Sequence, residues 1–264
     1  MSDAAIDRPR SLAIPRRMLG VFGQQILLLA ILLLMWEAAG AWLVDPFWCS
    51  RPSWIAQRLW EMAVRGTLLR HVAATVQEAG LGLALGAVTG TALGLLMARY
   101  SRASRVAEPL FMGLYSLPRV ALAPLFVLWF GIGLLSKVMM SFSMVVFIFV
   151  LNVLEGIRAL DRDPIDLMRS MRASPAFIAR RVLLPAVAPW IVAALRIGVG
   201  LSLIGAVVGE LIGSNRGLGW YIEQSAGQLD TTGVFTGIVI LLAVAMAANQ
   251  TVAALERRLT RWRA

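Results

Sequence analysis

Residues 137–156 read Lys-Val-Met-Met-Ser-Phe-Ser-Met-Val-Val-Phe-Ile-Phe-Val-Leu-Asn-Val-Leu-Glu-Gly, a run long and apolar enough to cross a bilayer. A helix needs roughly 20 apolar residues to span the hydrocarbon core. A spanning segment must satisfy its own backbone hydrogen bonds, so it forms a helix. The other segments that qualify are about 19–44, 72–98, 108–131, 186–211 and 233–254. The sequence therefore predicts an all-α, polytopic membrane helix bundle with six transmembrane helices.

The composition agrees with a membrane protein. Of the 264 residues, 59% are apolar and only 15% are charged, which is too apolar for a soluble domain of this size. The net charge of +10 would suggest a nucleic-acid partner in a soluble chain. Here the basic residues flank the apolar spans, which is the signal for orientation in a membrane. We therefore expect contact with membrane lipid and no nucleic acid.

The arginines and the single lysine predict how the chain is oriented. Seventeen basic residues lie beside the first span, between the second and third spans, between the fourth and fifth, and after the sixth, against six in the remaining loops. Positively charged loops stay on the cytoplasmic side. Both termini and the loop 157–185 are thus predicted to be cytoplasmic, with residues 1–18 forming a tail and 19–264 a single transmembrane domain.

The loop 157–185 carries two signals for the start of a helix. Asp163 precedes Pro164, and proline is tolerated at the first helical position because its missing N–H would be unpaired there. Asp166 then falls at the third helical position. Ser174-Pro175 repeats the start signal eleven residues later. The loop should therefore contain two short helices that meet near Arg172 and Ala173.

The first of these helices is amphipathic. Ile165, Met168 and Met171 share an apolar side, while Asp166, Arg169 and Ser170 face elsewhere. Such a helix on the surface of a membrane protein needs something to cover its apolar side. A separate protein is one candidate; the chain's own bundle or the lipid headgroups are the other.

The spacing of this loop resembles a known motif. Asp166, the step to position 172 and the ending Val182-x-Leu184-Pro185 are similar to the "EAA" loop of ABC importer permeases. Asp166 stands for the motif's glutamate, Leu167 and Met168 for its two alanines, and Arg172 for its glycine. A turn between helices commonly uses a left-handed residue, which glycine reaches without penalty. Either the turn is made differently here or the loop is a divergent one.

The resemblance extends from about Val72 to the C-terminus. Residues 117–133, Leu-Pro-Arg-Val-Ala-Leu-Ala-Pro-Leu-Phe-Val-Leu-Trp-Phe-Gly-Ile-Gly, look like the third membrane segment of the same family, particularly its nitrate, sulfonate and taurine branch. Arg180-Arg-Val-Leu-Leu-Pro185 and Gly217-Leu-Gly219 also resemble that branch.

The resemblance implies a type I importer permease in a bacterial inner membrane. In that family the permease forms a dimer, binds cytoplasmic ABC ATPase subunits that hold ATP and Mg, and receives solute from an extracytoplasmic binding protein. The loop would dock on the ATPase. The residues that the motif or its helix places there are Asp163, Ile165, Asp166, Met168, Arg169, Met171, Arg172, Ala173, Leu184 and Pro185. Two arginines predicted to lie within spans, together with the resemblance to the nitrate, sulfonate and taurine branch, suggest that the solute is a small anion. Nitrate, a sulfonate or a taurine-like compound would fit.

Three ionisable residues within the predicted spans are candidates for the translocation pathway: Arg119, Arg196 and Glu210. A cationic side chain at the centre of a spanning helix costs at least ~2.5 kcal/mol, so such residues should face protein or water. Arg119 could instead cap carbonyls freed by Pro118 and Pro124, or pair with Glu78. In the second span Gly82, Gly86, Gly90 and Gly94 predict a close helix–helix contact, either fixed packing or a contact that slides during transport.

The sequence does not predict an enzyme. A phosphate-binding loop needs Gly-x-x-x-x-Gly-Lys-Ser/Thr, and the only lysine, Lys137, lies between Ser136 and Val138. One histidine and one cysteine make neither a zinc site nor a catalytic pair. We therefore expect no catalytic, cofactor-binding or metal-binding residues. The alternative function is a self-sufficient secondary transporter or channel, but no convincing pair of inverted repeats is visible.

Overall fold

The computed structural model describes residues 16–43, 45, 47–160 and 163–259, and every regular element in these ranges is a helix. In chain order the helices are α1 (Arg16–Trp42), α2 (Pro52–Val64), α3 (Thr67–Arg99), α4 (Ser101–Ser116), the 3-10 turn η1 (Arg119–Leu122), α5 (Ala123–Phe130), α6 (Leu134–Arg158), α7 (Asp163–Ser170), α8 (Pro175–Ile178), the π-helical segment η2 (Ala179–Leu183), α9 (Leu184–Ile212), α10 (Leu218–Gly227) and α11 (Thr231–Leu259). The all-α architecture is confirmed.

Five helical stretches of the described residues are long and apolar enough to cross a membrane. They contain α1, α3, α6, α9 and α11. A sixth crossing exists only if α4 and the segment η1–α5 count together as one span. The predicted third span, 108–131, is therefore not one straight helix.

Proline explains this break. The helix axis turns by 80° between Ser116 and Arg119. A residue before proline is pushed out of the helical region, and Leu117, which precedes Pro118, is extended with ψ 138°. The chain then re-enters a helix through η1, and Pro124 sits in the first turn of α5, where proline is tolerated.

Helices α3, α6 and α9 form the core, and the predicted glycine strip lies in their contact. A Cβ atom at Gly90 would come within 2.5 Å of the carbonyl oxygen of Val146, and one at Gly94 within 2.8 Å of Val153. On α9, a Cβ at Gly205 would lie 2.6 Å from the backbone of Ser141. The glycines are thus sites where α6 approaches its neighbours too closely for any side chain.

Helix α6 is the most buried of the candidate spans. Its apolar side chains fill the space between α5 and α9, where Met140, Val145 and Phe149 are fully buried together with Ala123 and Ala194. Ser141 ties the three core helices, because its hydroxyl donates to the Ser202 carbonyl oxygen at 3.0 Å and approaches that of Ala79 at 3.5 Å.

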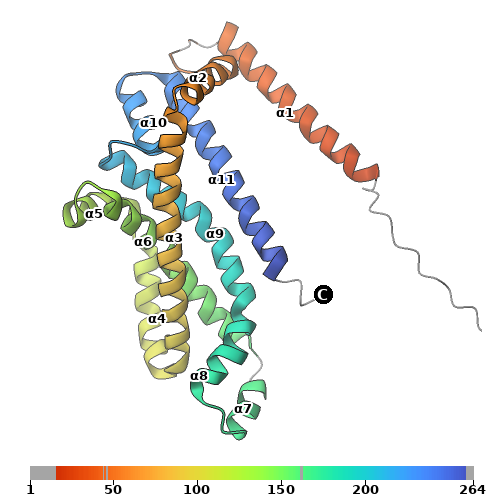
Figure 1. Cartoon of the computed structure of the whole chain (residues 1–264), viewed down its shortest axis with the longest axis vertical. Helices are drawn as coiled ribbons and strands as arrows, with labels where there is room; N and C mark the ends of the chain where they lie inside the picture. Colours follow the sequence, from red (N-terminus) through yellow and green to blue (C-terminus); the bar gives the residue numbers. More distant parts are fainter. Residues whose placement is uncertain (1–15, 44, 46, 161–162, 260–264) are drawn as a thin grey trace, which may run out of the picture.

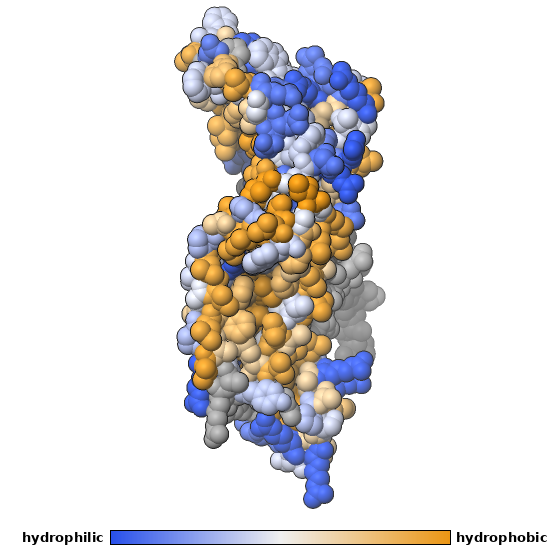
Figure 2. Space-filling view, turned by 90° about the vertical axis from the view of Figure 1, so that its left-hand side faces the viewer, coloured by the Kyte–Doolittle hydropathy of each residue, from blue (hydrophilic) through white to orange (hydrophobic). Residues whose placement is uncertain are grey.

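The molecule is elongated, with polar structures at both ends (Figure 1). Helices α7 and α8 lie at one end, and α2 and α10 lie at the other. A broad apolar surface covers the middle, and polar side chains gather toward the two ends (Figure 2). Helix α1 leans away from the bundle and meets it at α2. We call the α7–α8 end the loop end, and the α2–α10 end the cap end.

A shorter helix lies between α1 and α3 at the cap end. Helix α2 occupies Pro52–Val64, and its Ile55 and Met62 are buried. Met62 packs with Leu218 of α10 and Ile240 of α11. The helix is therefore fixed to the bundle by its own apolar side rather than resting only on lipid.

Candidate functional site

The turn between α7 and α8 is made in the way that glycine usually makes it, although the residue is Arg172. Arg172 has φ +57°, the left-handed conformation. The amide of Arg172 donates to the carbonyl oxygen of Arg169 at 2.9 Å, and that of Ala173 to Met168 at 3.0 Å. This pair of bonds is the Schellman pattern that ends many helices. The turn is therefore not made differently: Arg172 takes the left-handed conformation at the position of the motif's glycine.

Helix α8 begins as predicted at Ser174-Pro175. The hydroxyl oxygen of Ser174 accepts a hydrogen bond from the amide of Phe177 at 3.2 Å, which satisfies one free donor of the first turn. The backbone then continues through the π-helical segment Ala179–Leu183 into α9, so that Pro175–Ile212 is one helical stretch of 38 residues. The loop is therefore joined to a long core helix without an intervening coil.

The three residues predicted to form the apolar side of the first loop helix differ in their exposure. Ile165 and Met168 are half-buried against the rest of the chain, whereas Met171 is 69% exposed. Leu167, which the sequence analysis treated only as a departure from the motif, is 59% exposed. Leu167 and Met171 are four residues apart and so share one side of α7. We call the exposed pair Leu167 and Met171 the loop face.

The remaining loop residues surround this face. The side chain of Asp166 is exposed and forms an ion pair with Arg169 at 3.1 Å. Such exposed pairs contribute little to stability, so Asp166 stays available to another partner. Asp163, Arg172, Leu184 and Pro185 are exposed, and Ala173 is half-buried.

Arg119 is held by main-chain carbonyl groups. It is only 8% exposed, and its Nη1 donates to the carbonyl oxygens of Ser143 and Met144 at 3.0 and 2.8 Å. Its Nη2 donates to Tyr115 at 2.9 Å, and the guanidinium lies over the rings of Tyr115 and Phe147. Arg119 therefore fastens the bent α4–α5 segment to α6, rather than pairing with Glu78.

Arg196 lies on an exposed part of α9. Its side chain is 61% exposed and forms an ion pair with Glu256 near the end of α11. Arg196 is near the middle of α9, as the sequence predicted, and its partner Glu256 is near the C-terminal end of α11. Of the three predicted pathway residues, Arg196 alone has an exposed side chain.

Glu210 is 1% exposed and lies at the cap end of α9. One carboxylate oxygen accepts from the hydroxyl of Thr75 at 2.6 Å, and the other accepts from the amide of Gly219 at 2.5 Å. Glu78 and Lys137, both buried, are its charged neighbours. The structure does not bring Arg119, Arg196 and Glu210 together in one cavity.

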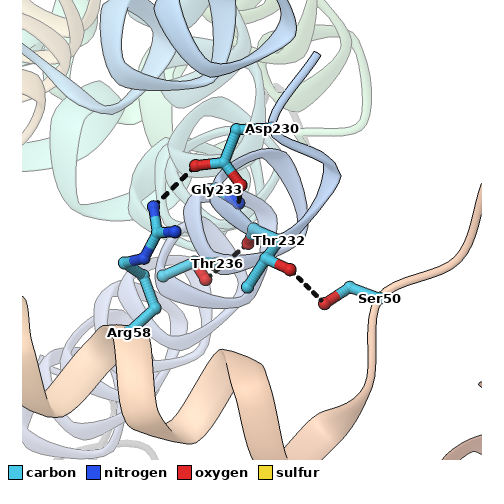
Figure 3. Close-up of polar contacts among 6 residues, drawn as sticks. All are labelled: Ser50, Arg58, Asp230, Thr232, Gly233 and Thr236. Atoms are coloured by element: carbon cyan, nitrogen blue, oxygen red, sulfur yellow. Dashed lines mark hydrogen bonds and ion pairs between the residues drawn. The ribbon is translucent and has the colours of Figure 1, made fainter. Parts of the chain in front are cut away.

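A second polar cluster joins α2 to α11 at the cap end (Figure 3). Arg58 donates to Asp230 at 2.6 Å, Asp230 accepts from the amide of Gly233 at 2.9 Å, and Ser50 donates to Thr232 at 3.0 Å. Partial burial opposes the charged form of Arg58, but its hydrogen bonds, chiefly that to Asp230, outweigh this effect and raise the pKa of the guanidinium.

Two parts of the cap end were not predicted from the sequence. One is α10, which is only ten residues long. The other is the buried pair His71 and Thr75, which lie four residues apart on one side of α3. Polar residues three or four apart within an otherwise apolar span were the signal that could have revealed it. In the described ranges no group of three His, Cys, Asp or Glu residues is arranged to hold a metal ion.

Comparison with known proteins now gives this geometry a context. Residues 90–261 match the family described as "Binding-protein-dependent transport system inner membrane component". The formylaminopyrimidine transport permease protein ThiX of Halalkalibacterium halodurans is 33% identical over 88% of this chain and 93% of its own length. The putative aliphatic sulfonates transport permease protein SsuC of Bacillus subtilis is 31% identical over 90% of this chain and 87% of its own length.

A solved structure shares the fold. A chain of the MetNI methionine ABC transporter in an inward-facing conformation superposes with a TM-score of 0.59 at 20% identity, covering 73% of this chain and 97% of that one. At this identity the similarity concerns the fold alone.

Proposed function

The chain belongs to the family of binding-protein-dependent transport system inner membrane components, the permease subunits of ATP-driven importers, and we propose that its loop face docks on the ATPase subunit. The single observation that carries this proposal is the exposure of Leu167 and Met171 at the loop end. Large apolar side chains on a polar end of a protein mark an interaction site. The family membership does not favour a self-sufficient transporter or channel.

The surroundings of the loop face suit a protein partner. Exposed charged side chains lie in the same loop, including Asp166 and Arg169 of α7 and the arginines at 180 and 181. An apolar centre with a polar rim is typical of protein interfaces. ATP and Mg²⁺ would be bound by the partner, because no P-loop is present in this sequence.

We also propose that the loop end and both termini are cytoplasmic. The basic residues before and at the start of α1, on either side of the α3–α4 junction, between α6 and α9, and at and after the end of α11 support this orientation. The cap end would then face outward and receive solute from the binding protein that the family description names. The boundaries 1–18 and 19–264 for tail and transmembrane domain belong to the same proposal.

A second copy of the chain completes the proposed membrane unit. Trp190, Ile197, Ile204 and Leu211 are exposed apolar residues spaced seven apart on α9. A seven-residue repeat is typical of helices that pack on one another. Arg196 lies on the exposed surface of the same helix. A charged side chain within a span is more stable against protein or water than against lipid, so a partner at this surface suits Arg196.

The solute is proposed to be a small anion. A relative that names aliphatic sulfonates supports this, and Arg196 is the candidate cation with an exposed side chain. Arg196→Gln should lower the uptake of a sulfonate such as taurine while leaving the complex assembled, and Arg196→Lys should retain uptake. Unchanged uptake in Arg196→Gln, or loss of the folded subunit in both variants, would remove this argument.

The docking proposal is tested by co-purification with the ATPase. Full burial of a Leu or Met side chain stabilises a contact by about 1.5–3 kcal/mol, and every 1.4 kcal/mol is about tenfold in affinity. Leu167→Glu and Met171→Glu should therefore each weaken ATPase binding roughly tenfold to a hundredfold. Asp166→Lys should have a smaller effect, about 0.3–1 kcal/mol from the conflict with the positive end of its own helix.

Leu69→Glu is the matched control. Leu69 is 74% exposed on the first turn of α3, at the cap end. This variant should bind the ATPase as the wild type does. Normal co-purification of Leu167→Glu and Met171→Glu, or loss of binding in Leu69→Glu alone, would contradict docking through the loop face.

A further inference from the structure

Three consecutive amides at the start of α10 are bound by side chains from other helices. The amide of Gly217 donates to Nδ1 of His71 at 3.2 Å, that of Leu218 to the hydroxyl oxygen of Thr75 at 2.8 Å, and that of Gly219 to a carboxylate oxygen of Glu210 at 2.5 Å. The first amides of a helix have no partner within the helix. Here α3 and α9 supply all three acceptors.

Glu210 is central to this arrangement, which we call the α10 joint: His71, Thr75, Glu210 and residues 217–219. Its second carboxylate oxygen accepts from Thr75 at 2.6 Å, so α9 holds α10 both directly and through α3. A carboxylate at a helix N-terminus is also favoured by the helix dipole. Each of the three amides thus has its own side-chain acceptor, and the residues of the joint are buried.

The glycines of the α10 joint allow the backbone of α10 to contact α9 directly. Gly217 has φ +110°, and a Cβ atom there would overlap the carboxylate of Glu210. At Gly219 a Cβ would lie 2.6 Å from the carbonyl oxygen of Val207. The backbone of α10 is thus seated directly on α9, and the contact has little freedom to slide unless its hydrogen bonds break.

The joint connects two larger assemblies. On one side, α9 belongs to the unbroken helical stretch that begins at Pro175 beside the loop face. On the other side, α10 packs on α11, and α11 is tied to α2 through Asp230 and Arg58 (Figure 3). Movement of α9 relative to α3 would therefore displace the residues that hold α10.

We propose that Glu210, with Thr75, is a positioning residue for transport: it transmits movement of α9 from the ATPase end to α10 at the cap end. This rests on the proposed docking at the loop face. It assigns Glu210 a role inside the protein rather than in the solute pathway, where the sequence placed it.

The test follows α10 directly and needs no solute. Gln224 is exposed on α10, and Cys49 is the only cysteine of the chain. A Cys49→Ser background with Gln224→Cys gives one thiol at the cap end. Its rate of labelling by a maleimide is measured in the assembled complex with the ATPase, in the absence of nucleotide and with ATP plus vanadate.

In this background the labelling rate should change at least threefold when ATP and vanadate are added. Glu210→Gln exchanges one acceptor for a donor, and Thr75→Val removes the hydroxyl at similar volume. Both should reduce the nucleotide-dependent ratio to about one while the ATPase still co-purifies. Thr75→Ser, which restores a hydroxyl, should recover the ratio.

Thr89→Val is the matched control on the same helix, because the Thr89 hydroxyl bonds only to Leu85 of its own helix in the described contacts. It should retain the ratio. If Glu210→Gln does not assemble, Thr75→Val carries the test. A retained ratio in Thr75→Val or Glu210→Gln, or no response to nucleotide in the parent background, would overturn the proposal. Co-purification of the loop-face variants with the ATPase tests the docking proposal separately. Failure of docking can therefore be told apart from failure of the role proposed for Glu210.

Discussion

Arg172 shows how a single residue can keep the geometry of a motif without its usual chemistry. Its spacing predicted a turn between two helices, and the structure has that turn with Arg172 at φ +57°. Glycine reaches this region at no steric cost, whereas other L-residues are penalised. The sequence could predict the position of the turn, but not that an arginine would accept the strain.

Replacing Arg172 with glycine should therefore stabilise the loop. We expect a gain of about 1 kcal/mol, because the left-handed conformation costs a non-glycine residue roughly that amount. Amide hydrogen exchange across residues 165–178 should slow. Arg169→Gly, on the helical part of α7, is the control and should speed exchange, since glycine lowers helix stability by about 1 kcal/mol. Faster exchange in Arg172→Gly would refute this explanation of the turn.

For Arg119 and Glu210 the sequence predicted the kind of surroundings but not the partners. Both were identified as ionisable groups that must face protein or water within a span. Their partners include main-chain atoms of other helices: the carbonyl oxygens of Ser143 and Met144 for Arg119 and the amide of Gly219 for Glu210. No periodicity in the sequence encodes such partners, because they depend on how the helices pack.

Among the elements, straight spans were predictable and broken ones were not. Apolar length located α3, α6, α9 and α11 to within several residues at each end. The same criterion merged α4, η1 and α5 into one span, although Pro118 marks the bend. The length of an apolar run says nothing about the direction of the helix axis, so it could not predict the 80° turn. Helix α10 is too short to be found this way.

The glycine strip gives a prediction for the α3–α6 pair. At Gly90 a Cβ would meet Val146 and Phe149 at 2.5 and 2.7 Å, whereas at Gly80 it would meet nothing within 4 Å. Gly90→Ala should lower stability by about 1–3 kcal/mol from overpacking, partly offset by better helix propensity. Gly80→Ala, with only the propensity gain, should be neutral or stabilising.

Thermal unfolding in detergent, followed by size-exclusion chromatography of the heated samples, measures this difference. Gly90→Ala should lose its folded peak at a lower temperature than Gly80→Ala. Equal behaviour of the two variants would mean that α3 and α6 have room to separate, as the sliding alternative requires.

At the scale of the whole molecule, the structure places the loop face and the α10 joint at opposite ends. The α9 helix of 29 residues is about 43 Å long at 1.5 Å per residue. It runs from the loop end to Glu210 without a coil. An ATPase bound at one end is thus linked to the other end through one continuous helical stretch, which suits alternating access.

The central claim is that the ATPase docks on the loop face, and site-specific crosslinking tests it most directly. In the Cys49→Ser background, which keeps an acceptor for the Trp36 indole, a photoreactive maleimide is attached to Met171→Cys or to Gln228→Cys. The first thiol lies on the loop face and the second is exposed at the cap end. Both proteins are irradiated in membranes that contain the ATPase.

We predict a covalent adduct with the ATPase from Met171→Cys and none from Gln228→Cys. An adduct from Gln228→Cys in the absence of one from Met171→Cys would place the ATPase at the cap end and contradict both the docking surface and the orientation.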